Sequence, residues 1–285
     1  MIGAISGDVI GSVHEGAFAK AKDFPLFVPD STFTDDTVLT VAVASAIRER
    51  VDFGTSIRRW GRRYPHAGYG GWFRDWLFRE DAAPYNSFGN GSAMRVAAIG
   101  WAFEDLDVVL HEATKSAEVT HNHPEGIKGA QAVAAAILLA RAGQGKDQIA
   151  ALLSDRFGYD CTMGLSALQR RGGFDVTCQG TVPAAAVAFL QSTDFEDAVR
   201  NAVSFGGDAD TLACIAGAMA EAHYGGVPAE IQAEVLGRLD DALRAEVMAF
   251  AREYGVPLTD DSNIREGERP HWPPRLAKPR SNRRD

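Results

Sequence analysis

The sequence predicts a single all-α domain, and three observations lead to this prediction. Apolar residues recur with helical spacing along most of the 285 residues, and strand-like alternation is nearly absent. Hydrophobic residues make up 46% of the chain, which is ample for one large packed core. No internal repeat and no change of composition divides the chain before about residue 265.

The first expected helix, Gly3–Val13, consists of small and apolar residues. Its glycines are spaced four apart, at Gly3, Gly7 and Gly11. On a helix they form one smooth face that lets another backbone approach closely. Asp8 and Glu15 lie seven apart, so they are expected on one face near the end of this helix, as surface or as site residues.

The rest of the chain is expected to form helices joined by short irregular segments. The expected helices are 35–50, 56–64, one from about 93, 104–119, 125–142, 147–157, 183–191, 195–205, 211–224 and 228–254, the last broken near Asp240. The helix at 35–50 is apolar almost all round, which is typical of a central helix. Pro183 is expected in a first helical turn. The glycine-rich stretches 68–72 and 158–180 are expected to be irregular.

Residues 265–285 contain prolines and arginines without apolar periodicity, which predicts a flexible tail outside the domain of residues 1–264. Two interpretations of this tail remain open. It is a solvated end of the chain, or it helps to recruit an acidic partner or nucleic acid.

Charge and cysteine content exclude several classes of protein. The net charge of −9 and the pI near 5.3 argue against stable nucleic-acid binding and against a membrane-surface protein. The three cysteines are odd in number and form no CxxC pair, so neither a disulfide framework nor a zinc site is expected. The N-terminus lacks a basic segment, and no apolar run is long enough to span a bilayer. We therefore expect a cytoplasmic protein, and a monomer.

Two acidic turns each precede a strongly apolar helix. They are Thr34-Asp35-Asp36-Thr37 and Gly206-Gly207-Asp208-Ala209-Asp210-Thr211. Carboxylate and hydroxyl oxygens are the ligands that Mg²⁺, Ca²⁺ and Mn²⁺ prefer. Alternatively, Thr34 or Asp208 caps its helix, with acidic residues favoured in the first turn. If both helices are buried, however, their carboxylates need partners, and a metal ion is a suitable one.

A glycine-rich loop at 87–92 leads into the helix expected from about residue 93. Glycine-rich turns that open a helix offer backbone N–H groups to an anion such as phosphate, although most such turns only connect elements. The His-Asn-His string at 121–123 is interpreted as a polar turn, because no further metal ligands or basic residues accompany it.

Taken together, these motifs resemble the ADP-ribosylglycohydrolase family, which includes dinitrogenase reductase-activating glycohydrolase and the animal ADP-ribosylhydrolases. The resemblance extends from Gly3 to about Pro228. It rests on Gly7-Asp8 with Glu15, Thr34-Asp35-Asp36-Thr37, Gly68-Tyr69-Gly70-Gly71, Gly89-Asn90-Gly91 with Ala93-Met94-Arg95, Thr120-His121, and Gly206-Gly207-Asp208-Ala209-Asp210-Thr211. The fold that it implies is a compact orthogonal bundle of helices.

The resemblance also implies a metal centre and a nucleotide site. Its ligands for two Mg²⁺ ions, with Mn²⁺ as a substitute, would be Thr34, Asp35, Asp36, Asp208, Asp210 and Thr211. Glu15 would gate the site or act as general acid or base, and Asp35 or Asp36 would activate water. The substrate would contact Tyr69, Gly70, Ser87, Phe88, Gly89, Asn90, Gly91, Met94 and His121. Of these, the 87–92 loop would hold the diphosphate, while Phe88 or Tyr69 would flank the base.

The implied activity is hydrolysis of the N- or O-glycosidic bond between ADP-ribose and an acceptor, most often a protein side chain, with ADP-ribose as product. A non-catalytic relative of the lens-crystallin kind is disfavoured, because every implied ligand position is retained. Asp208-Ala209-Asp210 is also a DxD motif, but Leu212 and the absence of strand patterns disfavour a phosphatase. The shared motifs hold the ADP-ribose half, so arginine, serine, other and nucleic-acid acceptors all remain open.

Overall fold

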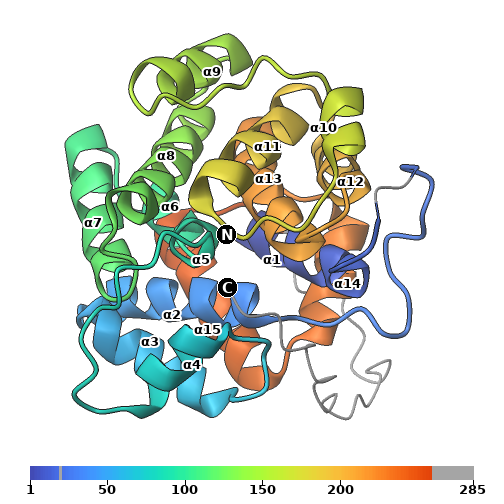
Figure 1. The fold of residues 1–285 in the computed structure, drawn as a ribbon. Helices are drawn as coiled ribbons and strands as arrows, with labels where there is room; N and C mark the ends of the chain where they lie inside the picture. Colours follow the sequence, from blue (N-terminus) through green and yellow to red (C-terminus); the bar gives the residue numbers. More distant parts are fainter. Residues whose placement is uncertain (19–20, 259–285) are drawn as a thin grey trace.

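Helices are the regular secondary structure of the part of the chain that the structure describes, which confirms the predicted all-α class (Figure 1). The computed structural model describes residues 1–18 and 21–258, and its secondary structure within these ranges contains no strand. The helices are α1 (Ile2–Gly11), α2 (Asp35–Glu49), α3 (Phe53–Arg63), α4 (Gly71–Phe78), α5 (Gly91–Met94), α6 (Ala97–Ala102), α7 (Leu106–Glu118), α8 (Pro124–Arg141), α9 (Lys146–Asp155), α10 (Leu165–Arg171), α11 (Cys178–Leu190), α12 (Phe195–Ser204), α13 (Ala209–Tyr224), α14 (Ala229–Arg238) and α15 (Asp241–Tyr254). No helix in these ranges is long and apolar enough to cross a membrane. The predicted tail at 265–285 lies outside the described residues.

The centre of the bundle is α13, which packs against α1, α8, α11 and α12. The contact with α1 is a backbone contact, as the glycine spacing predicted. A Cβ atom added at Gly7 would lie 2.0 Å from the carbonyl oxygen of Ala213, and one at Gly3 would lie 2.3 Å from that of Gly217. No side chain larger than hydrogen fits at either position without moving a backbone. This close packing places the last turn of α1 beside the first turn of α13, since a Cβ at Gly11 would lie 2.5 Å from the Cα of Asp210.

Helix α1 ends earlier than the sequence pattern suggested. It stops at Gly11, and a 3₁₀ turn follows at Ser12–His14. The expectation that Asp8 and Glu15 share one face of a single helix is therefore wrong. Glu15 lies beyond the turn, in a loop whose backbone is hydrogen-bonded to Gly207.

Several further helices depart from the prediction. Helix α3 begins at Phe53 rather than at residue 56, and α4 begins at Gly71, inside the stretch 68–72 that was expected to be irregular. Pro183 lies inside α11, which begins at Cys178 rather than at the proline. Thr177 caps this helix by accepting a hydrogen bond from the amide of Gly180, so the cap sets the start and Pro183 removes only one internal hydrogen bond. Within the stretch 158–180, expected to be irregular, a short helix α10 is present. Its apolar residues are too few to give a clear period, and only Leu168 is buried.

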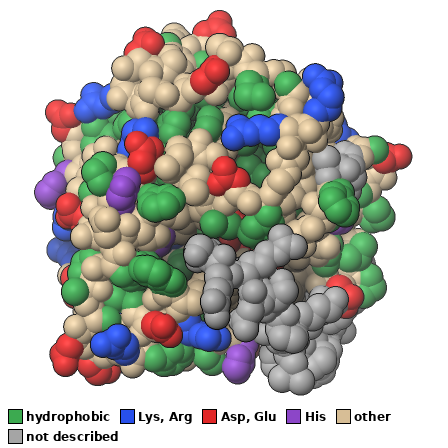
Figure 2. All heavy atoms as spheres, viewed as in Figure 1, with side chains coloured by type: hydrophobic (Ala, Val, Ile, Leu, Met, Phe, Trp, Pro, Cys, Tyr) green, Lys and Arg blue, Asp and Glu red, His purple; other side chains and the backbone are tan. Residues whose placement is uncertain are grey.

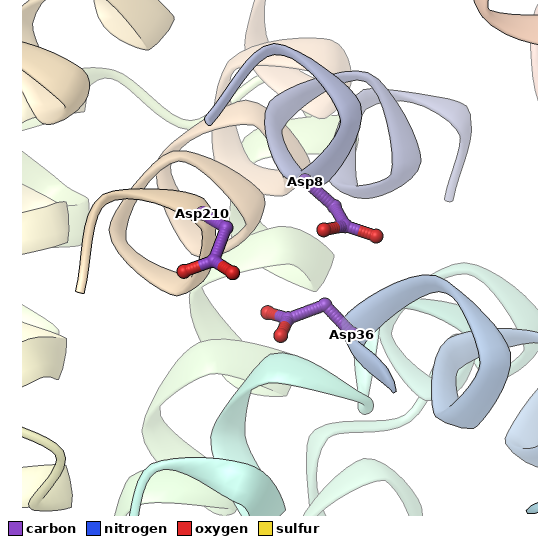
Figure 3. Close-up of side chains that lie close together, drawn as sticks. All are labelled: Asp8, Asp36 and Asp210. Atoms are coloured by element: carbon purple, nitrogen blue, oxygen red, sulfur yellow. The ribbon is translucent and has the colours of Figure 1, made fainter. Parts of the chain in front are cut away.

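Helix α2 is central, as predicted, and most of it is buried. Thr34 caps it by accepting a hydrogen bond from the amide of Asp36. Helix α13 also begins where the second acidic turn predicted, with Asp208 in the capping position. The C-terminal end of α1 and the N-terminal ends of α2 and α13 consequently meet in one place, and acidic side chains extend from all three (Figure 3).

Candidate metal centre and nucleotide site

Five carboxylates from these converging segments form two contiguous groups. Asp8, Asp36 and Asp210 each offer an oxygen within 4.8 Å of the others, and they point toward one another in Figure 3. Glu15, Asp208 and Asp210 form a second group with the same spacing. Asp210 belongs to both groups, so the chain presents one continuous acidic centre.

The structure brings together most, but not all, of the carboxylates that the sequence singled out as ligands. Asp36, Asp208 and Asp210 are in the groups, whereas Asp35 is half-buried in the first turn of α2 and belongs to neither. Asp8 was not among the predicted ligands. The signal that could have identified it was a single carboxylate in an otherwise apolar helix, here completely buried.

Asp8 connects α1 to the start of α2 through hydrogen bonds. Its carboxylate accepts from the backbone amides of Thr34 and Thr37 at 2.9 and 3.1 Å, and from the hydroxyls of both threonines. Three of these donors share Oδ2, which is thereby saturated, whereas Oδ1 accepts one bond, from the hydroxyl of Thr34. Burial nevertheless raises the pKa of Asp8 to about 6, although the hydrogen bonds act in the opposite direction. Asp8 therefore positions the acidic turn more than it binds a ligand.

Asp36 has an incomplete set of partners. One carboxylate oxygen accepts a hydrogen bond from the hydroxyl of Thr211 at 3.3 Å, and the hydroxyl of Thr34 lies 3.5 Å from the same oxygen but gives its single proton to Asp8. The other oxygen, Oδ1, is buried and has no hydrogen-bond partner among the described residues. Burial, followed by the charges of Asp8, Asp35 and Asp208, raises the pKa of Asp36. A buried carboxylate oxygen without a donor is destabilising unless a cation or a proton compensates it.

Asp208 and Asp210 lie on either side of the first residue of α13. The side chain of Asp208 does not cap the helix, so the capping interpretation is wrong for this residue. Its Oδ2 atom instead accepts a hydrogen bond of 2.6 Å from the side-chain amide of Asn90. Among the residues that the structure describes, Asp210 accepts only a local bond from the amide of Thr211, and burial together with the charges of Asp208 and Asp36 raises its pKa.

The donor set fits a hard divalent cation. The five grouped carboxylates and the hydroxyls of Thr34 and Thr211 offer hard oxygen ligands, which suit Mg²⁺, Mn²⁺ or Ca²⁺ rather than a soft metal. The raised pKa values of Asp36 and Asp210 show that their ionised forms are poorly compensated by the protein alone. A cation would supply the missing positive charge and a partner for Asp36 Oδ1.

The loop with Glu15 is fixed to the acidic turn by backbone hydrogen bonds. The amide of Gly16 donates to the carbonyl of Gly207 at 2.7 Å, and the amide of Gly207 donates to the carbonyl of Ala17 at 2.9 Å. Gly207 has a left-handed conformation, with φ of 67°, and a Cβ there would lie 2.2 Å from the carbonyl oxygen of Gly173. The Glu15 carboxylate is thus held beside Asp208 and Asp210 while remaining half-buried.

The sequence suggested that the backbone amides of the glycine-rich loop bind an anion, but two of these amides already donate hydrogen bonds within the protein. The amide of Asn90 already donates to the carbonyl of Val176 at 2.7 Å, and that of Gly89 donates to the hydroxyl of Ser87 at 3.1 Å. Neither amide is therefore available to an anion in this conformation. The side chain of Asn90 instead joins the loop to Asp208, so the loop and the acidic centre form one unit.

His121 lies against this loop. The buried guanidinium of Arg95 donates to the hydroxyl of Thr120 at 3.3 Å, and that hydroxyl lies 2.7 Å from His121 Nδ1. This contact is compatible with both neutral tautomers, because the hydroxyl can donate to Nδ1 or accept from its N–H. A Cβ at Gly91 would lie 3.1 Å from Nε2, and burial lowers the pKa of His121. A neutral ring therefore lies against the Gly89–Gly91 segment.

The aromatic candidates differ in accessibility. Phe88 is 44% exposed and packs its edge against His123 with ring centroids 5.3 Å apart. Tyr69 is only 8% exposed and packs against Phe73 at 5.2 Å, so Phe88 offers far more ring surface. A row of rings that the sequence analysis missed extends from His121 to Tyr85 at 6.0 Å and on to Trp72 at 6.1 Å.

Gly70 and Met94, the two remaining candidates for substrate contact, also differ in accessibility. A Cβ added at Gly70 would meet no atom within 4 Å, so the backbone there is open. Met94 is buried, and its carbonyl oxygen accepts a hydrogen bond from the hydroxyl of Thr40 at 3.3 Å.

Comparisons with known proteins show which proteins this chain resembles. The family model for ADP-ribosylglycohydrolase matches residues 1–262. ADP-ribosylhydrolase ARH3 of Danio rerio is 26% identical over 327 residues, covering 85% of this chain and 88% of the relative. ADP-ribosylarginine hydrolase Tri1 of Pseudomonas putida (strain GB-1) is 24% identical over 264 residues, covering 81% and 71%. A solved structure described as an ADP-ribosylglycohydrolase-related protein complex superposes with a TM-score of 0.67 at 28% identity, covering 88% of this chain and 96% of that one.

Proposed function

The chain belongs to the ADP-ribosylglycohydrolase family, and on this premise we propose that it is a Mg²⁺-dependent hydrolase that releases ADP-ribose from an ADP-ribosylated acceptor. The observation that carries this proposal is the continuous acidic centre around Asp210, with a buried Asp36 oxygen that lacks a partner. A centre of hard oxygen ligands beside a donor-bearing loop fits a substrate with both sugar hydroxyls and a diphosphate.

The residues proposed to hold two Mg²⁺ ions are Thr34, Asp35, Asp36, Asp208, Asp210 and Thr211. Four carboxylates balance the charge of two dications, and the hydroxyls of the threonines add neutral ligands. Mg²⁺ bound there would supply positive charge that orients ribose hydroxyls and lowers the pKa of a bound water. Asp35 has no place in either carboxylate group, so its role as a ligand requires its side chain to turn toward Asp36.

Glu15 is proposed as the general acid or base at the scissile bond. It is the half-buried carboxylate of the centre, whereas Asp8, Asp36, Asp208 and Asp210 are buried. A half-buried carboxylate beside the sugar site can exchange protons with the acceptor group and with solvent. The backbone bonds between its loop and Gly207 hold it in place, which general acid–base catalysis requires.

The diphosphate is proposed to lie along the loop 87–92, within reach of His121, whose neutral ring is proposed to carry its proton on Nε2. A neutral imidazole donor keeps its hydrogen bond to phosphate over a wide pH range, because burial disfavours the charged ring. The exposed ring of Phe88 is proposed to flank the base.

A thermal-shift experiment tests the metal-bridged binding site. ADP-ribose together with Mg²⁺ is expected to raise the melting temperature more than either alone, and a ligand at a hundred times its Kd stabilises by about 2.7 kcal/mol. Equal stabilisation by ADP-ribose in excess EDTA would refute binding through the metals.

A substrate panel tests turnover and identifies the acceptor. Purified substrates with ADP-ribose on arginine, serine, glutamate and nucleic acid would be incubated with the protein and Mg²⁺, and free ADP-ribose would be measured. Release from at least one linkage is expected. ADP-ribose binding without release from any linkage would instead identify a non-catalytic binding protein.

A further inference from the structure

Arg95 is a cation in the interior of the protein, close to the 87–92 loop. It follows α5 and has no exposed surface. Its guanidinium donates to the carbonyl of Ser116 and, at 3.3 Å, to the hydroxyl of Thr120. Among the residues that the structure describes, Nε of Arg95 has no hydrogen-bond partner, and no Asp or Glu forms an ion pair with the guanidinium. This part of the protein therefore buries a positive charge without a counter-charge.

A buried charge of this kind is unfavourable unless another charge compensates it. Burial lowers the pKa of Arg95 to about 10, so the guanidinium is still charged at neutral pH. The simplest role for the side chain is structural, because it joins the end of α5 to the end of α7. Ser116 and Thr120 offer uncharged acceptors, however, and a neutral donor would satisfy them equally. The structural role thus does not explain why a cation occupies this position.

The charge of Arg95 acts on groups that border the 87–92 loop. Burial lowers the pKa of His121, and the charge of Arg95 lowers it further. Burial raises the pKa of Cys178, and the charge of Arg95 acts in the opposite direction. The thiol of Cys178 donates to the carbonyl of Gly89 at 3.1 Å, and a Cβ at Gly91 would lie 3.1 Å from His121 Nε2. Arg95 therefore creates a positive potential along this loop.

The loop itself offers a diphosphate little positive charge. The backbone amides of Ser87, Gly89 and Asn90 already donate to acceptors within the protein. No Lys or Arg occurs between residues 80 and 94. On the face shown in Figure 2, the described Lys and Arg side chains are interspersed with Asp and Glu and form no continuous basic patch. A dianionic group on this loop therefore depends on a charge from the interior.

We propose that Arg95 is a positioning residue whose buried charge holds the diphosphate of the substrate on the 87–92 loop, acting through Thr120 and His121. This role rests on the proposed function, which places the diphosphate along the loop. The negative charges of the diphosphate compensate the buried guanidinium without contacting it. Arg95 thereby favours ligands that carry phosphate groups at this position over neutral ones.

Calorimetric titration of the full chain with ADP-ribose in Mg²⁺ at pH 6 tests the charge. Arg95→Met removes the charge but keeps a side chain of similar length. It is expected to weaken ADP-ribose binding about tenfold or more, the effect of two unit charges about 10 Å apart at an effective dielectric constant of about 20. Arg141→Met is the matched control, because Arg141 is half-buried and also donates to backbone carbonyls, those of Gly100 and Phe103. It should leave the affinity unchanged.

Arg95→Lys replaces the permanent charge by one that depends on pH. The introduced amine is charged at pH 6, whereas burial lowers its pKa enough to make it neutral at about pH 9. The affinity of this chain for ADP-ribose is expected to lie near that of the wild type at pH 6 and to fall about tenfold below it at about pH 9. A side chain that only joined α5 to α7 would not give such a dependence.

Melting curves without ligand verify that each chain is folded. Equal affinities of the wild type and of folded Arg95→Met would overturn this role for Arg95, as would parallel pH dependences of the wild type and Arg95→Lys. The second comparison decides alone if the methionine variant does not fold. Absence of ADP-ribose binding by the wild type would instead refute the proposed function, and the role of Arg95 with it.

Discussion

Asp210→Asn separates a metal ligand from a residue that only stabilises a helix. The substitution nearly preserves the size of the side chain, and the amide oxygen can still accept the hydrogen bond from the backbone of Thr211. It removes one negative charge at the point where the two carboxylate groups overlap. The substitution should therefore lower turnover in Mg²⁺, whereas the stability of the metal-free protein should stay the same or rise.

The magnitude follows from the separations in the centre. Two unit charges 4.8 Å apart repel by about 3.5 kcal/mol at an effective dielectric constant of about 20. Protonation relieves part of this repulsion in the metal-free protein, as the raised pKa of Asp210 indicates. We therefore expect the free energy of unfolding in EDTA to stay the same or to rise by about 1–3 kcal/mol. In Mg²⁺, loss of an anionic ligand should lower turnover by roughly 10²-fold or more.

The assay combines a melting curve in EDTA with ADP-ribose release in Mg²⁺. Asp107→Asn is the matched control, because Asp107 is an exposed acid in the first turn of α7. It should lose about 0.3–1 kcal/mol of stability and keep normal turnover. If Asp210→Asn behaved like this control, with turnover near that of the wild type, the assignment of the metal centre would be refuted.

Four further outcomes follow from individual contacts. Gly7→Ala should destabilise the fold by about 3 kcal/mol or more in melting curves, because its Cβ would lie 2.0 Å from a backbone oxygen. Gly237→Ala is the control, because a Cβ at that position would meet no atom within 4 Å. Asn90→Ala removes the donor to Asp208 and should weaken Mg²⁺ binding by about 10–100-fold in calorimetry. The pKa of His121 is lower in the folded chain than in the unfolded chain, so its contribution to stability is present above pH 6.5 and is lost as the pH falls. Relative to His121→Gln, the wild type should lose up to about 1.4 kcal/mol per pH unit below 6.5 in denaturant titrations, and a parallel pH dependence in both chains would contradict the neutral-ring interpretation. Removal of residues 265–285 should leave hydrolysis of a small ADP-ribosyl substrate unchanged, whereas a large loss would show that the tail completes the site.

The sequence predicted the helices wherever the apolar period was long and continuous. The central positions of α2 and α13 and the close contact at the α1 glycines followed from composition and spacing alone. The sequence pattern did not predict helix boundaries that are set by a single side-chain hydrogen bond. The Thr177 cap moved the start of α11 ahead of Pro183, and a threonine gives no periodic signal.

The candidate site could be predicted only as separate pieces. Both acidic turns were evident, because acidic residues preceding a buried helix are conspicuous in a sequence. The connections between them are contacts over long distances in the chain, such as that from Asn90 to Asp208 or from Asp8 to Thr34. No local pattern encodes such a contact, so the sequence suggested a phosphate loop but did not indicate that Asn90 of this loop supports the carboxylate of Asp208.

The acidic residues of the centre differ in how much free hydrogen-bond acceptor capacity they keep. Asp8 receives four hydrogen bonds from Thr34 and Thr37, and these bonds hold the start of α2 against α1. Asp36 and Asp210 receive too few donors for their burial and retain acceptor capacity. The glycine contact between α1 and α13 keeps these carboxylates close although they repel one another. The packing of the core therefore supplies the energy that assembles the site, and a bound cation would remove the repulsion that this assembly creates.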